Sequence, residues 1–153
     1  MPNDHLTTYL NDHLAGSTAA LELLEHLERA DAELAGFARD LRRDIEDDRG
    51  ELEALIAKLG SSPSVLRQAA AWVTEKVARL KLSADDPVGD TLKRLEALEA
   101  VAIGIHGKSL LWRVLQSVPA AAGPDYAALI SRAEEQKGRV EAARLSAARA
   151  AFA

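Results

Sequence analysis

Three polar residues, His13, Asp48 and His106, each occupy a position in a helical pattern where an apolar side chain is expected. Two imidazoles and a carboxylate are ligands that zinc, iron and manganese accept. Glu99 precedes His106 by about two turns of helix and is a further candidate ligand. The sequence therefore predicts a candidate metal site of His13, Asp48 and His106 for Fe, Mn or Zn, if all three side chains meet.

The same residues also fit a buried hydrogen-bonded network that fixes the register of the helices. An unpaired buried carboxylate is costly, so Asp48 would accept a hydrogen bond from a histidine or from Lys137. An ammonium group in that layer would repel a metal ion and neutralise Asp48. We favour this interpretation, in which the protein needs no cofactor.

Apolar residues at alternating steps of three and four predict the helices that carry these groups. The first helix begins at Asn3 or Asp4 and ends near Arg29, and the second covers about 32–59 and ends at Gly60. So short a connection predicts antiparallel neighbours. The apolar stripe of the first helix is predicted as Leu6, Leu10, His13, Ser17, Ala20, Leu24 and Leu27, and that of the second as Leu34, Phe37, Leu41, Ile45, Asp48, Leu52, Leu55 and Leu59.

The second half of the chain repeats this plan after a crossover helix at about 63–82, which starts at Ser62 and Pro63. A third long helix runs from Asp90 to Pro119, and a last one runs from Asp125 towards the Ala-rich end of the sequence. The apolar stripe of the last helix is predicted as Tyr126, Ile130, Ala133, Lys137, Val140 and Arg144.

The third long helix has two apolar faces, which predicts burial on more than one side. One face carries Leu92, Leu95, Glu99, Ile103, His106 and Leu110, and the other carries Leu98, Val101, Ile105, Trp112 and Leu115. The crossover helix is the natural cover for the second face, through Trp72 and Val73. A homodimer interface through the third helix or the crossover helix is the competing cover.

Two helical hairpins joined by a long helical connection resemble the ferritin-like superfamily, whose bundles leave helices two and three parallel. The resemblance covers nearly the whole chain and implies an all-α, ferritin-like four-helix bundle. In that arrangement His13, Asp48 and His106 lie about 15, 16 and 18 Å above the same end of the bundle. The Glu-x-x-His ligand motifs of the di-iron members do not occur; the nearest pairs are Glu22 with His26 and Glu99 with His106.

Composition limits the remaining possibilities. The 153 residues suit a single domain, 1–153, and the absence of cysteine excludes disulfides and thiolate chemistry. A net charge of -5 argues against a nucleic-acid partner. No run is apolar enough for a membrane span, and no signal peptide is visible, so the cytoplasm is the expected compartment.

Two functional hypotheses follow, and whether the protein is an enzyme stays open. The first and favoured one is a non-enzymatic, stress-associated or interaction protein with a structural polar layer and an unknown protein partner. The second is a metal-binding bundle with oxidoreductase-type activity.

Overall fold

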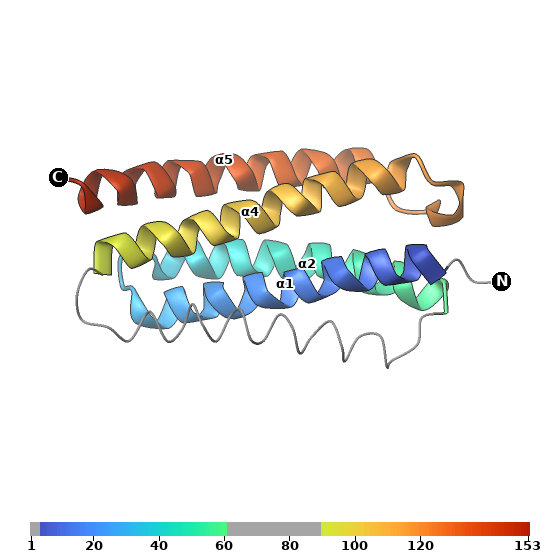
Figure 1. Ribbon diagram of the computed structural model, residues 1–153, viewed down its shortest axis with the longest axis horizontal. Helices are drawn as coiled ribbons and strands as arrows, with labels where there is room; N and C mark the ends of the chain where they lie inside the picture. Colours follow the sequence, from blue (N-terminus) through green and yellow to red (C-terminus); the bar gives the residue numbers. More distant parts are fainter. Residues whose placement is uncertain (1–3, 61–89) are drawn as a thin grey trace. The chain divides into compact units, whose positions relative to one another are not determined.

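The computed structural model describes residues 4–60 and 90–153, and almost all of these residues are helical (Figure 1). The long helices are α1 (Asp4–Ala30), α2 (Ala35–Lys58), α4 (Asp90–Gln116) and α5 (Tyr126–Ala151), with a short 3₁₀ helix η1 (Pro119–Ala121) before α5. The described part of the chain contains no strand, which confirms the all-α class. The crossover helix predicted at about 63–82 lies outside the described residues.

Helices α1 and α2 form an antiparallel hairpin (Figure 1). Asp31 organises the connection, because its Oδ1 accepts hydrogen bonds from the backbone N–H groups of Glu33 and Leu34 at 3.1 Å each. This local turn delays α2 to Ala35, later than the predicted start at about residue 32. The core of the hairpin is aliphatic, with Leu10, Leu24 and Leu41 fully buried.

The end of α2 agrees with the sequence prediction. Gly60 has a φ of 74°, a left-handed conformation that glycine adopts without steric cost. Its N–H donates to the carbonyl of Ala57, which satisfies one of the last carbonyls of the helix. A glycine at this position therefore stops the helix where the pattern predicted.

Helices α4 and α5 form a second antiparallel hairpin, joined by a turn that contains η1 (Figure 1). Asp125, where the last helix was predicted to begin, caps α5 by accepting a hydrogen bond from the N–H of Ala128 at 3.0 Å. The buried Tyr126 donates its hydroxyl hydrogen to the carbonyl of Ala121, which fixes the turn against the first residue of α5. Its ring lies 6.2 Å from that of Trp112, centroid to centroid.

The chain divides into two compact units, between Val77 and Ala78. The α1–α2 hairpin belongs to the first unit and the α4–α5 hairpin to the second. The single domain expected from chain length stays a prediction.

Candidate functional site

His13 lies on α1 at the edge of the buried stripe. It is half-buried, and its ring contacts that of Tyr9 edge-on at a centroid distance of 4.7 Å. Burial lowers the pKa of His13 below its usual value, and the nearby charge of Asp12 opposes this shift only in part. The neutral imidazole is therefore the form that the folded protein favours.

The stripe that α1 buries is rotated slightly from the predicted one. Leu14 and Asn11 are buried while His13, Ser17 and Ala20 are only half-buried. Asn11 was not predicted as a core residue. Its Nδ2 donates to the carbonyl of the half-buried Thr7 at 2.9 Å. An amide that satisfies its donor within its own helix can be buried at low cost.

Asp48 is buried, as its place in the pattern predicted, with only 1% of its surface exposed. It follows Leu41 and Ile45 and precedes Leu52 and Leu55 in an unbroken alternation of three and four along α2, and all four neighbours are buried. A carboxylate in such a stripe is under strong pressure to be hydrogen-bonded.

The register of α1 against α2 separates His13 from Asp48 along the hairpin. Arg49 donates to Thr18 at 2.7 Å, and Arg39 pairs with Glu28 at 2.9 Å. These contacts place Asp48 beside residues 18–19 of α1, roughly 8 Å along the helix axis from His13. The expected common height of the two residues is therefore wrong, because the turn at Asp31 shifts α2 relative to α1.

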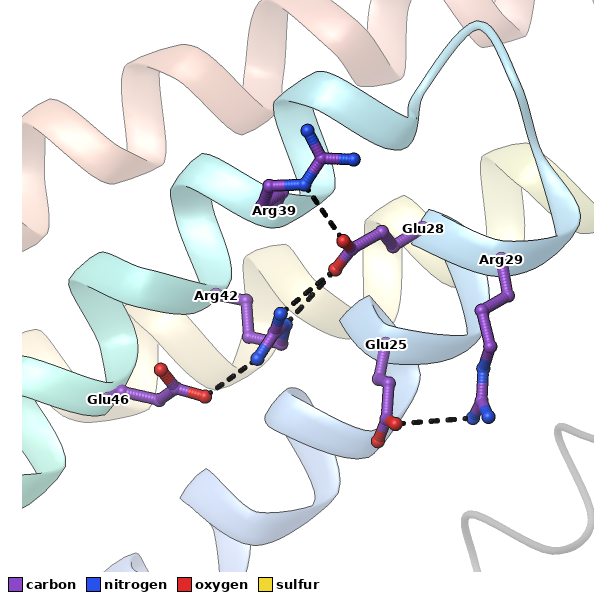
Figure 2. Close-up of polar contacts among 6 residues, drawn as sticks. All are labelled: Glu25, Glu28, Arg29, Arg39, Arg42 and Glu46. Atoms are coloured by element: carbon purple, nitrogen blue, oxygen red, sulfur yellow. Dashed lines mark hydrogen bonds and ion pairs between the residues drawn. The ribbon is translucent and has the colours of Figure 1, made fainter.

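The connection end of the same hairpin carries a charged cluster rather than a ligand set. Figure 2 shows the Glu28 carboxylate between Arg39 and Arg42, and Arg42 continues to Glu46 at 2.9 Å. The hydrogen bond from Arg39 is the main cause that lowers the pKa of Glu28. Both oxygens of this carboxylate are occupied, so the cluster joins α1 to α2 electrostatically.

His106 and Glu99, the two candidates on α4, are both exposed. Glu99 accepts an ion-paired hydrogen bond from Arg144 of α5 at 3.1 Å. Of the two apolar faces predicted on α4, one is buried, with Leu98, Val101, Ile105, Trp112 and Leu115. On the other face Leu95 is buried, whereas Leu92, Glu99, Ile103, His106 and Leu110 are exposed. The predicted cover by the crossover helix lies outside the described residues, so burial of this face stays a prediction.

The open face of α4 holds a row of exposed side chains that includes large apolar ones. Four of them have exposed fractions of 45% (Leu92), 74% (Ile103), 49% (Leu110) and 43% (Val114). We call this face the α4 stripe; it consists of Leu92, Glu96, Glu99, Ile103, His106, Leu110, Arg113 and Val114. Apolar side chains gathered on one face of a helix, unlike single exposed ones, mark a surface for interaction.

Buried polar groups between α4 and α5 lie close to positions that the pattern marked, but not on them. Ser109 is buried and its Oγ donates to Glu134 at 3.0 Å, while Lys108 donates to the buried Gln136. Lys137, predicted for the core, is half-buried and pairs with Glu134 at 3.1 Å. Hydrogen bonds from Lys137 and then Ser109 lower the pKa of Glu134. Compared with the predicted orientation, α5 is rotated by about one residue. It therefore buries the neutral amide of Gln136 and leaves the ammonium group of Lys137 partly in water, which avoids the cost of desolvating a charge.

Within residues 4–60 and 90–153, no three His, Asp or Glu side chains lie close enough together to hold a metal ion. None of the helices in these ranges is both long and apolar enough to cross a membrane. Comparisons with models of protein families, with curated proteins and with solved structures found no match for this chain.

Proposed function

We propose that this chain is a non-enzymatic helical protein that works by binding another protein through the α4 stripe. The exposed apolar residues of α4 carry this proposal. Ile103 is among the most exposed large apolar side chains of the described residues, and it lies at the middle of a 27-residue helix. Complete burial of an exposed aliphatic side chain is worth about 1.5–3 kcal/mol, so covering Ile103 would gain most of this, and covering the half-exposed Leu92 and Leu110 about half of it each.

The residues that surround the apolar positions support a protein partner. Between its apolar residues the α4 stripe carries the carboxylates of Glu96 and Glu99, the imidazole of His106 and the guanidinium of Arg113. Protein interfaces combine apolar anchors with a polar rim in this way. A partner protein binds such a face through the side chains that lie three and four residues apart on the helix.

The ferritin-like arrangement is also part of the proposal. Two antiparallel hairpins are joined by about 30 residues of sequence. A connection of that length can run along a 24-residue helix even at the helical rise of about 1.5 Å per residue. In this proposal Asp48 is a structural residue of the bundle interior.

A photo-crosslinking experiment tests the interaction surface. Ile103 is replaced by p-benzoylphenylalanine in the full chain, and the matched control carries the same residue at Leu145, an exposed apolar position of α5. We expect protein adducts from position 103, with a second copy or with a different protein, and far fewer from position 145.

Thiol labelling gives the second readout, because the chain contains no cysteine. In dilute protein, I103C should react with a maleimide about as fast as the unfolded chain. Slow labelling together with no adduct would mean that the chain itself covers the α4 stripe, and the proposal would be wrong.

The metal-binding bundle is the second candidate, and the buried carboxylate of Asp48 is the observation that favours it. We propose Fe, Mn or Zn as the ions to test. The ligands predicted from the sequence are His13, Asp48, His106 and Glu99, and in the hairpin register given above His13 and Asp48 could hold one ion only after a shift of α1 against α2. Mass spectrometry of the untagged protein would measure metal content beside the His13→Ala and His106→Ala variants. Near-stoichiometric metal that both variants lose would support this candidate, and wild-type protein without metal would oppose it.

A further inference from the structure

The α4 stripe has the residue spacing of a helix that pairs with another helix over its whole length. From Leu92 to Arg113 its seven members follow steps of four and three without interruption, which is the spacing of a coiled-coil seam, with apolar residues at three of the positions and charged or polar residues at the other four. Ile103 lies at the centre of α4, which runs from Asp90 to Gln116. A second helix of equal length, crossing at Ile103, would therefore cover the stripe from end to end.

The charges of the stripe are divided between its two halves. Glu96 and Glu99 lie before Ile103, whereas His106 and Arg113 lie after it. Two copies of α4 in antiparallel orientation bring the acidic half of one copy to the basic half of the other. A parallel pair would instead place Glu96 and Glu99 against their own copies, which is unfavourable.

Some of the apolar members follow the same symmetry. When Ile103 lies against its own copy, Leu92 of one chain comes opposite Val114 of the other, whereas Leu110 comes opposite Glu96, which is then within a turn of Arg113. A two-fold interface requires this reciprocity, since each contact of residue i with residue j is repeated as j with i. The charges of the stripe are therefore complementary to those of a second, antiparallel copy.

We infer that the partner of the α4 stripe is a second copy of this chain, bound antiparallel along α4 with the two-fold axis at Ile103. This inference rests on the proposed function and names its partner. Two charged members of the stripe also contact α5 of the same chain: Glu99 pairs with Arg144 at 3.1 Å and Arg113 with Glu134 at 3.7 Å. The contact with Arg144 uses one oxygen of the Glu99 carboxylate, and the pair of Arg113 is the longer of the two.

Cysteine cross-linking tests the register directly, because a cysteine-free chain allows single thiols to be placed at will. Under mild oxidation, I103C should form a covalent dimer in most of the protein. L92C and V114C should form the mixed dimer at least about tenfold more than either forms with itself. L145C on α5 is the matched control and should remain largely uncross-linked.

Charge reversal gives an independent readout of the same pairing. Sedimentation velocity should show a dimer for the wild-type chain, and E96R or R113E should each weaken association by about tenfold or more. The double variant should recover most of the loss, because it restores opposite charges across the interface. Far-UV circular dichroism verifies that each variant is folded.

The alternative outcomes are distinct. Self-cross-linking of L92C, I103C and V114C to equal extents would indicate parallel pairing and would overturn the inference. A monomeric wild-type chain whose I103C thiol labels rapidly would also overturn it, while leaving another protein as the proposed partner. A monomer whose thiol is protected would overturn both the inference and the proposed function.

Discussion

Trp112 offers a test of how α4 is held, because two opposing terms decide the effect of one substitution. Its side chain is fully buried, and its Nε1–H donates no hydrogen bond to the described residues. A buried donor without a partner costs about 1–3 kcal/mol relative to its hydration in the unfolded chain. Trp112→Phe removes this cost and keeps an aromatic ring beside Tyr126.

The opposing term is the space that the smaller ring leaves empty. Phenylalanine is smaller than tryptophan by roughly 40 Å³, which at about 24 cal/mol per Å³ amounts to about 1 kcal/mol. The lost apolar area of roughly 30 Å² contributes less than about 1 kcal/mol. Since the two sides are of similar size, we expect Trp112→Phe to change the free energy of unfolding by no more than about 1 kcal/mol in either direction.

Urea unfolding followed by far-UV circular dichroism measures this difference, with the slope of the transition compared between variants. Trp112→Ala is the control; it should lose about 3–5 kcal/mol because the cavity is then much larger. A loss of more than about 2 kcal/mol for Trp112→Phe would show that the indole N–H has a partner in the folded protein, and would refute the reasoning.

Three further predictions use other contacts. Because burial lowers the pKa of His13, the stabilising effect of the neutral side chain should be complete above about pH 6.5 and should decline as the pH falls towards the lowered pKa. His13→Gln should therefore reduce the fall in the free energy of unfolding between about pH 7.5 and 5.5. An unchanged slope would contradict this prediction. In the proposed dimer Gly107 of one copy lies opposite Glu99 of the other, so a side chain added there would crowd the interface. Gly107→Ala should therefore weaken the dimer, although it should stabilise the isolated fold by about 1 kcal/mol because a Cβ there meets nothing within 4 Å. The control Gly50→Ala should only stabilise, and equal dimer affinity of the two variants in sedimentation would contradict this placement of Gly107. Tyr126→Phe should lower the free energy of unfolding by about 1–2 kcal/mol, because it leaves the buried carbonyl of Ala121 without its donor, and thermal unfolding that matches wild type would disprove that role.

The local parts of the fold could be predicted from the sequence because their causes lie within a few residues. Gly60 ends α2 in a left-handed conformation, and Asp125 caps α5 through its own side chain. The burial of Asp48 followed from the alternation of three and four in α2, which no tertiary contact had to reveal. Helix identity, helix ends and the inward direction of one polar side chain are therefore properties of the sequence by itself.

Only the tertiary structure determined which residues of α1 and α2 lie at the same height along their hairpin, and which face of α4 is buried. The Asp31 turn and the contact of Arg49 with Thr18 set a register that moves Asp48 away from His13. Likewise, the two apolar faces of α4 look equivalent in sequence, but Ile105 is buried and Ile103 is open. A periodic pattern defines the faces of a helix, whereas the rotation and offset of that helix depend on packing energies summed over residues distant in the chain.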